Sequence, residues 1–152
     1  MNSFYRFFYH FTRLVLGAVF IYASLDKILN PGAFAQAVFN YQVLPGELVN
    51  LTALILPWVE MILGACLLSN RWMTGASSLA AALMLIFMGL IFFNLARGLD
   101  ISCGCFSTDP GEGPMDKLTL LRDALFLVLA LCLVGLTYCK KTIYHKNQLY
   151  TV

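Results

Sequence analysis

The stretch WMTGASSLAAALMLIFMGLIFFNLA, from Trp72 to Ala96, contains no charged side chain. The hydrocarbon core of a bilayer is about 30 Å thick, and a helix needs roughly 20 mostly apolar residues to cross it. This stretch therefore predicts a transmembrane helix. The whole chain agrees, because 60% of its 152 residues are hydrophobic and only 12% are charged, whereas a soluble domain carries about 25% charged residues.

The same composition excludes several classes of protein. A net charge of +2 without a basic run cannot supply the patch that tracks nucleic-acid phosphates, so no nucleic-acid partner is predicted. The high apolar content is the opposite of what disordered chains show. Five cysteines are too few and too unevenly placed for a disulfide framework. We expect residues 1–152 to form a single transmembrane domain in contact with the lipid bilayer.

Three further segments are long and apolar enough to cross a membrane, at about residues 8–29, 48–69 and 118–139. Together with residues 72–96 they predict an all-α fold, an integral membrane four-helix bundle. Arg13 lies inside the first span, and its side chain is expected to reach back to the membrane surface. No small-x-small cleavage site follows this span, so it is expected to be a helix of the bundle rather than a signal peptide.

The connections on one side of the bundle are long enough to hold structure of their own. Residues 30–46 begin with Asn-Pro-Gly and end with Pro-Gly, and between these ends Phe34, Val38 and Tyr41 recur at helical spacing. This pattern predicts a short helix that lies in the membrane interface between the first two spans. The connection of residues 98–117 is rich in Gly, Pro and Asp and is expected to be an ordered outer loop.

The distribution of basic residues predicts the orientation of the bundle. One side receives Arg6, Arg13, Arg71, Lys140, Lys141 and Lys146. The other side receives Lys27, Arg97, Lys117 and Arg122. That second side also holds every acidic residue except Glu60. We therefore expect both termini in the cytoplasm and the two long connections outside.

Cys103 and Cys105 are the candidate catalytic residues, and the predicted topology places them on the oxidising side. A Cys-Gly-Cys pair can close a small, strained disulfide, and Gly104 supplies the backbone freedom that such a ring requires. Strained, exposed disulfides tend to exchange with other thiols. Because so small a ring removes little loop entropy, the pair suits exchange with a partner better than stabilisation.

Other roles stay open for this pair. The disulfide can merely stiffen the loop, or one cysteine can bond permanently to a separate protein. A closed metal site would need two further ligands, and His10 and His145 belong to the cytoplasmic side, so no metal is predicted. The remaining cysteines are expected to be small buried hydrophobic residues. They are Cys66, Cys132 and Cys139.

Glu60 is the ionisable residue that the spans place deepest in the membrane, where a charged side chain costs about 2.5–3.5 kcal/mol on insertion scales. It is a candidate proton acceptor or the anchor of a polar network. The alternatives are a protonated carboxyl, or an ion pair with an arginine of another helix. Arg97 and Arg122 fall near the outer ends of their spans, where a cation can stabilise a nearby thiolate. Their alternative role is to anchor the helices in the interface.

Motifs spread from Arg13 to Leu136 resemble those of a family of membrane proteins. In chain order they are Arg13-Leu14-x-x-Gly17, Phe20-Ile21-Tyr22-Ala23-Ser24-x-Asp26-Lys27, Asn30-Pro31, Tyr41-Gln42-x-Leu44-Pro45, Leu56-Pro57-Trp58-Val59-Glu60-x-x-x-Gly64, Cys103-Gly104-Cys105-Phe106 and Leu121-Arg122-Asp123. Together they resemble the DoxX-like proteins and, among these, the MauE branch of methylamine-utilisation membrane proteins. One departure is Ser107, where the family pattern leads us to expect glycine.

The resemblance implies a four-helix bundle in the bacterial inner membrane, with the loop of Cys103 and Cys105 in the periplasm. It implies a role in maturing methylamine dehydrogenase, whose small subunit needs many disulfides, alongside a thioredoxin-like partner. The expected function is thus thiol–disulfide exchange with that partner or its client. A non-enzymatic scaffold with a structural cysteine pair stays open, as does a small transport or quinone-interacting subunit that uses Glu60.

No cofactor is predicted. The architecture is also similar to the quinone-linked disulfide oxidoreductases, DsbB and vitamin K epoxide reductase. Those proteins carry a Cys-x-x-Cys motif and a second, shuttling cysteine pair, and this chain has neither. Quinone use is therefore unsupported by the residues, and whether the chain is an enzyme stays open.

Overall fold

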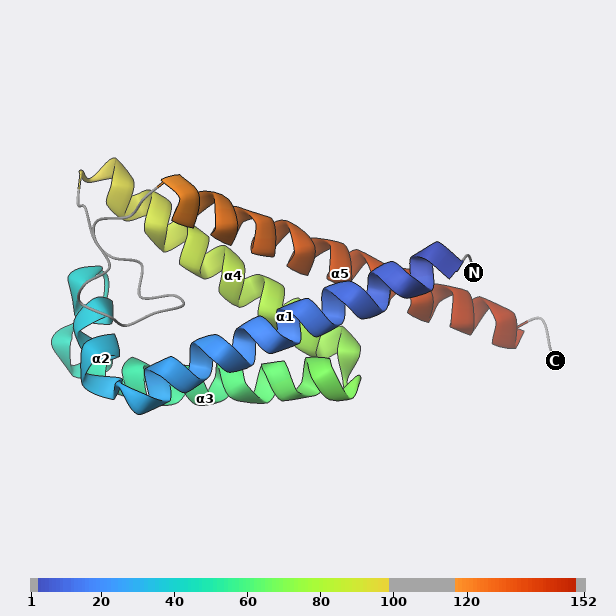
Figure 1. Ribbon diagram of the computed structural model, residues 1–152, viewed down its shortest axis with the longest axis horizontal. Helices are drawn as coiled ribbons and strands as arrows, with labels where there is room; N and C mark the ends of the chain where they lie inside the picture. The colour runs from blue at the N-terminus through green and yellow to red at the C-terminus, as the bar shows by residue number, and fades with distance from the viewer. Residues whose placement is uncertain (1–2, 99–116, 150–152) are drawn as a thin grey trace.

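The structure, a computed structural model, describes residues 3–98 and 117–149. The helices in these residues are α1 (Ser3–Leu29), α2 (Pro31–Asn40), α3 (Gly46–Ser69), α4 (Met73–Ala96) and α5 (Lys117–Leu149), as drawn in Figure 1. Within the described residues all of the regular structure is helical, which confirms the predicted all-α fold.

Four helices are long and apolar enough to cross a membrane, so the predicted membrane bundle is confirmed. The candidate spans are Ser3–Leu29, Gly46–Ser69, Met73–Ala96 and Leu120–Cys139. The short helix predicted between the first two spans is α2. Its first residue is Pro31, which suits a first helical turn because no intrahelical partner awaits its missing N–H group. Residues 99–116 of the predicted outer loop lie outside the described residues.

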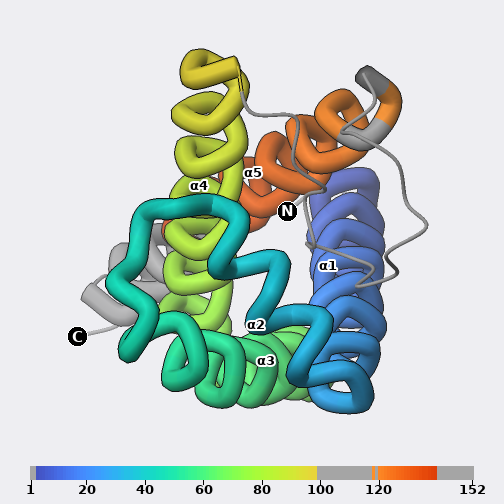
Figure 2. The backbone as a smooth tube through the Cα atoms, turned by 90° about the vertical axis from the view of Figure 1, so that its left-hand side faces the viewer, coloured from blue at the N-terminus to red at the C-terminus, as the bar shows by residue number. Residues whose placement is uncertain are grey.

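The long helices form two antiparallel pairs. α1 packs along α3, and α4 packs along α5. The pairs lie close together at the end of the molecule that holds both termini, and they diverge toward the end that holds α2 (Figure 1). Figure 2 looks onto this second end and shows α2 between α1 and α4.

The sizes of the side chains along α4 explain this divergence. The first half of α4 is rich in small residues, and Ala76, Ala80 and Ala81 are buried in a core shared with Leu16 and Leu133. Small residues let helices approach closely in lipid. The second half, Leu83–Phe93, is mostly Leu, Ile, Met and Phe. The larger side chains hold the pairs apart and leave space near α2.

The α3–α4 connection is short and tied to α1. Asn70 and Trp72 have left-handed backbone angles, with φ of 58° and 50°, so the chain reverses direction within residues 70–72. The N–H groups of Asn70 and Arg71 donate to the last carbonyls of α3, as in the usual C-terminal helix cap. The Tyr9 hydroxyl donates to Asn70 Oδ1 over 2.9 Å. The predicted tight turn is thus present and is fastened to the first helix.

Two glycines bring α1 and α3 into backbone contact. A Cβ atom added to Gly64 would lie 2.7 Å from Ile21 Cγ1 and 3.0 Å from the Gly17 carbonyl oxygen. A Cβ added to Gly17 would lie 2.8 Å from the Leu68 side chain. At Gly64 a larger residue would press on the backbone of α1, so this contact sets the alignment of α1 against α3.

Arg13 reaches the last turn of α3. Its side chain is buried, and Nη1 donates to the Leu68 carbonyl oxygen over 3.4 Å. Leu68 lies in the last turn of α3, where carbonyl groups lack helical partners and the helix dipole is negative. The end of α3 therefore offers the guanidinium a partner at the end of the span, and the reach of Arg13 to the membrane surface stays a prediction.

Candidate functional site

A buried ion pair joins α1 to α3 on the α2 side of the glycine contact. Lys27 Nζ lies 2.8 Å from both Oε1 and Oε2 of Glu60. Only 1% of Lys27 and 4% of Glu60 are exposed. Glu60 was predicted to pair with an arginine if it formed an ion pair, and the partner is instead a lysine.

The two residues meet although Lys27 stands at the end of α1 and Glu60 well inside α3. Helical side chains lean toward the N-terminus of their own helix. Because the helices are antiparallel, the Lys27 side chain leans into the bundle while Glu60 leans toward the α2 end. The Gly17–Gly64 contact brings the two backbones close enough for the pair to close. The ion pair is therefore a consequence of the helix alignment.

Aromatic rings from two further helices flank the Lys27 ammonium group. Nζ lies 5.0 Å from the centre of the Phe34 ring on α2 and 5.3 Å from that of Phe87 on α4. A cation within about 6 Å of an aromatic ring centre gains electrostatic attraction, which is larger when water is excluded. The ammonium group thus contacts side chains of α2, α3 and α4 from its own position on α1.

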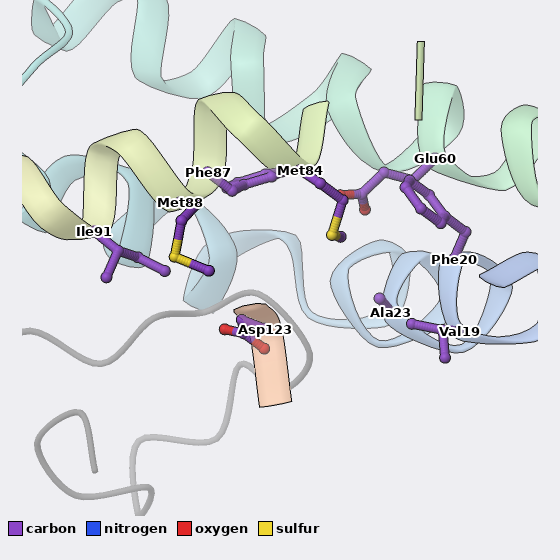
Figure 3. Close-up of a pocket in the computed structure, with 9 residues that line it drawn as sticks. All are labelled: Val19, Phe20, Ala23, Glu60, Met84, Phe87, Met88, Ile91 and Asp123. Atoms are coloured by element: carbon purple, nitrogen blue, oxygen red, sulfur yellow. The ribbon is translucent and has the colours of Figure 1, made fainter. Parts of the chain in front are cut away.

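A small pocket adjoins this pair in the space where the helix pairs diverge. Its volume is about 20 Å³, which is room for about one water molecule. Figure 3 shows Glu60 of α3 and Asp123 of α5 on different sides of the pocket, with Met84, Phe87 and Met88 of α4 along another side. The pocket therefore combines apolar walls with two carboxyl groups.

Asp123 forms the second polar part of the site. It is 5% exposed, and its Oδ1 accepts a hydrogen bond from Arg122 Nε over 3.1 Å. Tyr41 lies close enough to respond to this carboxylate: burial, and secondarily the charge of Asp123, raises the pKa of Tyr41 to about 12. Tyr41 therefore remains a neutral phenol at physiological pH.

Glu60 and Arg122 were predicted from the sequence as site residues, whereas Lys27 and Asp123 were not. The position of Lys27 could have been inferred from helical spacing, because Lys27 lies on the same face of α1 as the buried residues Phe20, Ala23 and Ser24. An ionisable residue on the buried face of a membrane helix needs a partner inside the bundle. Asp123 gave no such signal, because its neighbour Arg122 offered a local partner.

Arg97 lies at the rim of the bundle, apart from the Lys27–Glu60 pair. Its Nη2 donates to Gln42 Oε1 over 3.3 Å, and its guanidinium lies 5.4 Å from the centre of the Phe93 ring. Cys103 and Cys105 lie outside the described residues. The predicted effect of Arg97 and Arg122 on their thiolates thus stays a prediction.

The other three cysteines differ in exposure. Cys66, predicted to be buried, is partly buried and packs at the edge of the core. Cys132 and Cys139 are exposed on α5, so the prediction that they are buried is wrong. In a transmembrane helix of a bundle, such a face borders on lipid, where a small apolar side chain needs no protein neighbour.

The fold and the site define a multi-pass helical membrane protein with a buried charged cluster among its helices. Within this class, the family model described as "Methylamine utilisation protein MauE" matches residues 5–137. The chain belongs to the MauE family.

Curated relatives agree with this assignment. The chain is 34% identical over 122 residues to methylamine utilization protein MauE of Paracoccus denitrificans, covering 80% of this chain and 65% of the relative. It is 32% identical over 128 residues to the protein of the same name from Methylophilus methylotrophus, covering 84% of this chain and 64% of the relative. The chain thus spans about two-thirds of the length of these relatives. No solved structure matches it.

Proposed function

We propose that this protein serves methylamine utilisation as an inner-membrane thiol–disulfide redox protein. It assists the maturation of a periplasmic redox protein of the methylamine dehydrogenase type, together with a thioredoxin-like partner. The observation that carries the proposal is the Cys103-Gly104-Cys105 motif inside the region that matches the MauE family. The names of the two relatives supply the metabolic context.

The proposed reaction is an exchange of one disulfide for another. A thiolate of the client attacks one sulfur of the Cys103–Cys105 disulfide, that bond breaks, and a mixed disulfide forms. The second client thiolate attacks the mixed disulfide, so the client leaves with a new disulfide. Two electrons and two protons pass to Cys103 and Cys105, which become thiols. The same steps with the disulfide of the thioredoxin-like partner return the pair to its oxidised form.

The proposed orientation places the α2 end of the bundle in the periplasm and both termini in the cytoplasm. α4 ends and α5 begins at the α2 end, so the chain leaves and re-enters the bundle there on either side of the cysteine pair (Figure 1). The opposite end carries Arg6 and Arg71. An excess of basic residues at that end supports a cytoplasmic placement.

In this proposal Glu60 is a positioning residue. Both of its carboxylate oxygens accept hydrogen bonds from Lys27, which favours an ion-pair anchor over a free proton acceptor. The pair joins α1 to α3, and the rings of Phe34 and Phe87 beside Lys27 add α2 and α4 to the contact. The same observation favours the second candidate function, a membrane scaffold whose buried charges and cysteine pair are purely structural.

Thiol trapping distinguishes the two functions. Cys103→Ser, Cys105→Ser and the double variant are expressed in a methylotroph that lacks its own copy of the protein, with Cys132→Ser as the control. We expect one single variant to trap a mixed disulfide, and the double variant to stop maturation of the disulfide-rich small subunit. The control should mature it normally. Normal maturation with the double variant would establish the scaffold instead.

A further inference from the structure

An apolar crevice lies between the α2–α3 corner and α4, separate from the charged pocket. Its volume is about 350 Å³, and its accessible surface is entirely apolar. Leu44 and Leu56 line one side, Leu83 and Ile86 of α4 line the other, and the buried Tyr41 closes part of it. The crevice is in the range of volumes that hold small ligands, about 300–1,000 Å³.

The length of the crevice matches one leaflet of a bilayer. It runs from Leu44, just before α3 begins, to Leu56 inside that helix, a rise of about 15 Å at 1.5 Å per residue. Half of the hydrocarbon core is also about 15 Å. A volume of about 350 Å³ spread over that length is too small for a helix of another protein, which is about 10 Å across. Ile86, one of the lining residues, is 58% exposed. The shape suits a single hydrocarbon chain that enters from the membrane.

A cation marks the rim of the crevice at the membrane surface. Arg97 follows the last turn of α4 and donates a hydrogen bond to Gln42. The sequence neighbours of Gln42, Tyr41 and Val43, both line the crevice. Gln42 has a left-handed backbone, with φ of 51°, as residues that end a helix often do. This conformation presents its side chain to Arg97. The exposed guanidinium has further donors for an anionic group above the apolar walls.

We infer that the crevice binds one anionic phospholipid. An acyl chain fills the space between α3 and α4, and the phosphate lies at Arg97. The guanidinium of Arg97 matches the anionic phosphate of such a lipid, and the apolar crevice matches its acyl chain. The acyl chain would also fill space at the end of the bundle where the helix pairs diverge.

Native mass spectrometry of the full-length protein in mild detergent tests this inference with phosphatidylglycerol as the probe and phosphatidylcholine as its zwitterionic counterpart. The wild type should retain phosphatidylglycerol preferentially. Leu83→Trp and Ile86→Trp, which place a ring in the crevice, should lose most of the retained lipid. Leu54→Trp, on an exposed face of α3 away from the crevice, is the control and should retain it.

Arg97→Gln tests the headgroup contact separately. It should lower the preference for phosphatidylglycerol by about fivefold, the effect expected of one basic residue near an anionic surface. Arg71→Gln at the opposite end should leave the preference unchanged. Circular dichroism confirms that each variant folds. Equal lipid retention by the crevice variants and the control would overturn the inference, as would extraction of a neutral prenyl lipid in place of the phospholipid.

Discussion

Gly64 controls the stability of the bundle at the scale of a single residue. We predict that Gly64→Ala destabilises the protein by about 1–3 kcal/mol, the usual cost of overpacking, because the new methyl group would meet the Ile21 and Gly17 backbone atoms of α1. Denaturation in mixed micelles, followed by circular dichroism, measures the change. Gly17→Ala should cost less, because its nearest neighbour is the flexible end of Leu68.

Gly75 and Gly89 provide matched controls on α4. A Cβ at either position meets no atom of the described residues within 4 Å. Alanine there should stabilise the helix by up to about 1 kcal/mol, since glycine is the weaker helix former. Equal behaviour of Gly64→Ala and Gly89→Ala would refute the claim that backbone contact aligns α1 with α3.

Lys27 and Glu60 should show strong energetic coupling. We predict that Lys27→Met destabilises the bundle by about 3–5 kcal/mol, the typical cost of leaving one partner of a buried ion pair uncompensated. Adding Glu60→Gln to this variant should recover most of the loss, because the buried charge is then gone. A double-mutant cycle on the free energy of unfolding measures the coupling. Additive losses would contradict the direct pairing.

At the scale of an element, α2 depends on one aromatic side chain. Phe34 is 2% exposed and contacts the Lys27 ammonium group, whereas Phe39 on the same helix is 55% exposed. We predict that Phe34→Ala releases α2 from α3 and raises hydrogen exchange across residues 31–41, because the ring fastens the helix. Phe39→Ala is the control. Equal protection in both variants would show that other contacts hold α2.

The hydrogen bonds between side chains of different helices contribute less to stability than the ion pair does. Ser77 and Thr137 share a buried hydrogen bond of 3.2 Å between α4 and α5. Hydrogen bonds of this kind in membranes average about 0.6 kcal/mol. The α4–α5 pair is therefore stabilised mainly by the packing of Ala80, Ala130 and Leu133. The substitutions with the largest expected effects on the free energy of unfolding lie in the α1–α3 pair.

At the scale of the whole molecule, the termini and α2 occupy opposite ends (Figure 1). We predict that a cysteine at Gln36 of α2 is labelled by an impermeant maleimide from the periplasmic side only, and one at Ser3 from the cytoplasmic side only. A variant with all five native cysteines replaced by serine is the background. Labelling of both positions from one side would refute the four-span topology.

The membrane helices and α2 were predictable from the sequence, because each depends on local properties. An uncharged run such as residues 72–96 forms a helix in lipid whatever surrounds it, since its backbone groups must bond to one another. Proline at residue 31 and the Phe34, Val38 and Tyr41 spacing likewise act within a single segment. The cost of burying Glu60 was also evident, since it depends on depth alone.

The partner of Glu60 was decided only by the tertiary structure. Lys27 is 33 residues away, and at that separation the match depends on how α1 slides along α3, which the Gly17–Gly64 contact sets. The contact of Arg13 with the end of α3, the place of Asp123 beside the pocket and the exposure of Cys132 follow from the same packing. The sequence by itself determined which segments enter the membrane. The fit between helices determined which of their few charges meet, because charges in lipid must find partners and only helix alignment brings those partners within reach.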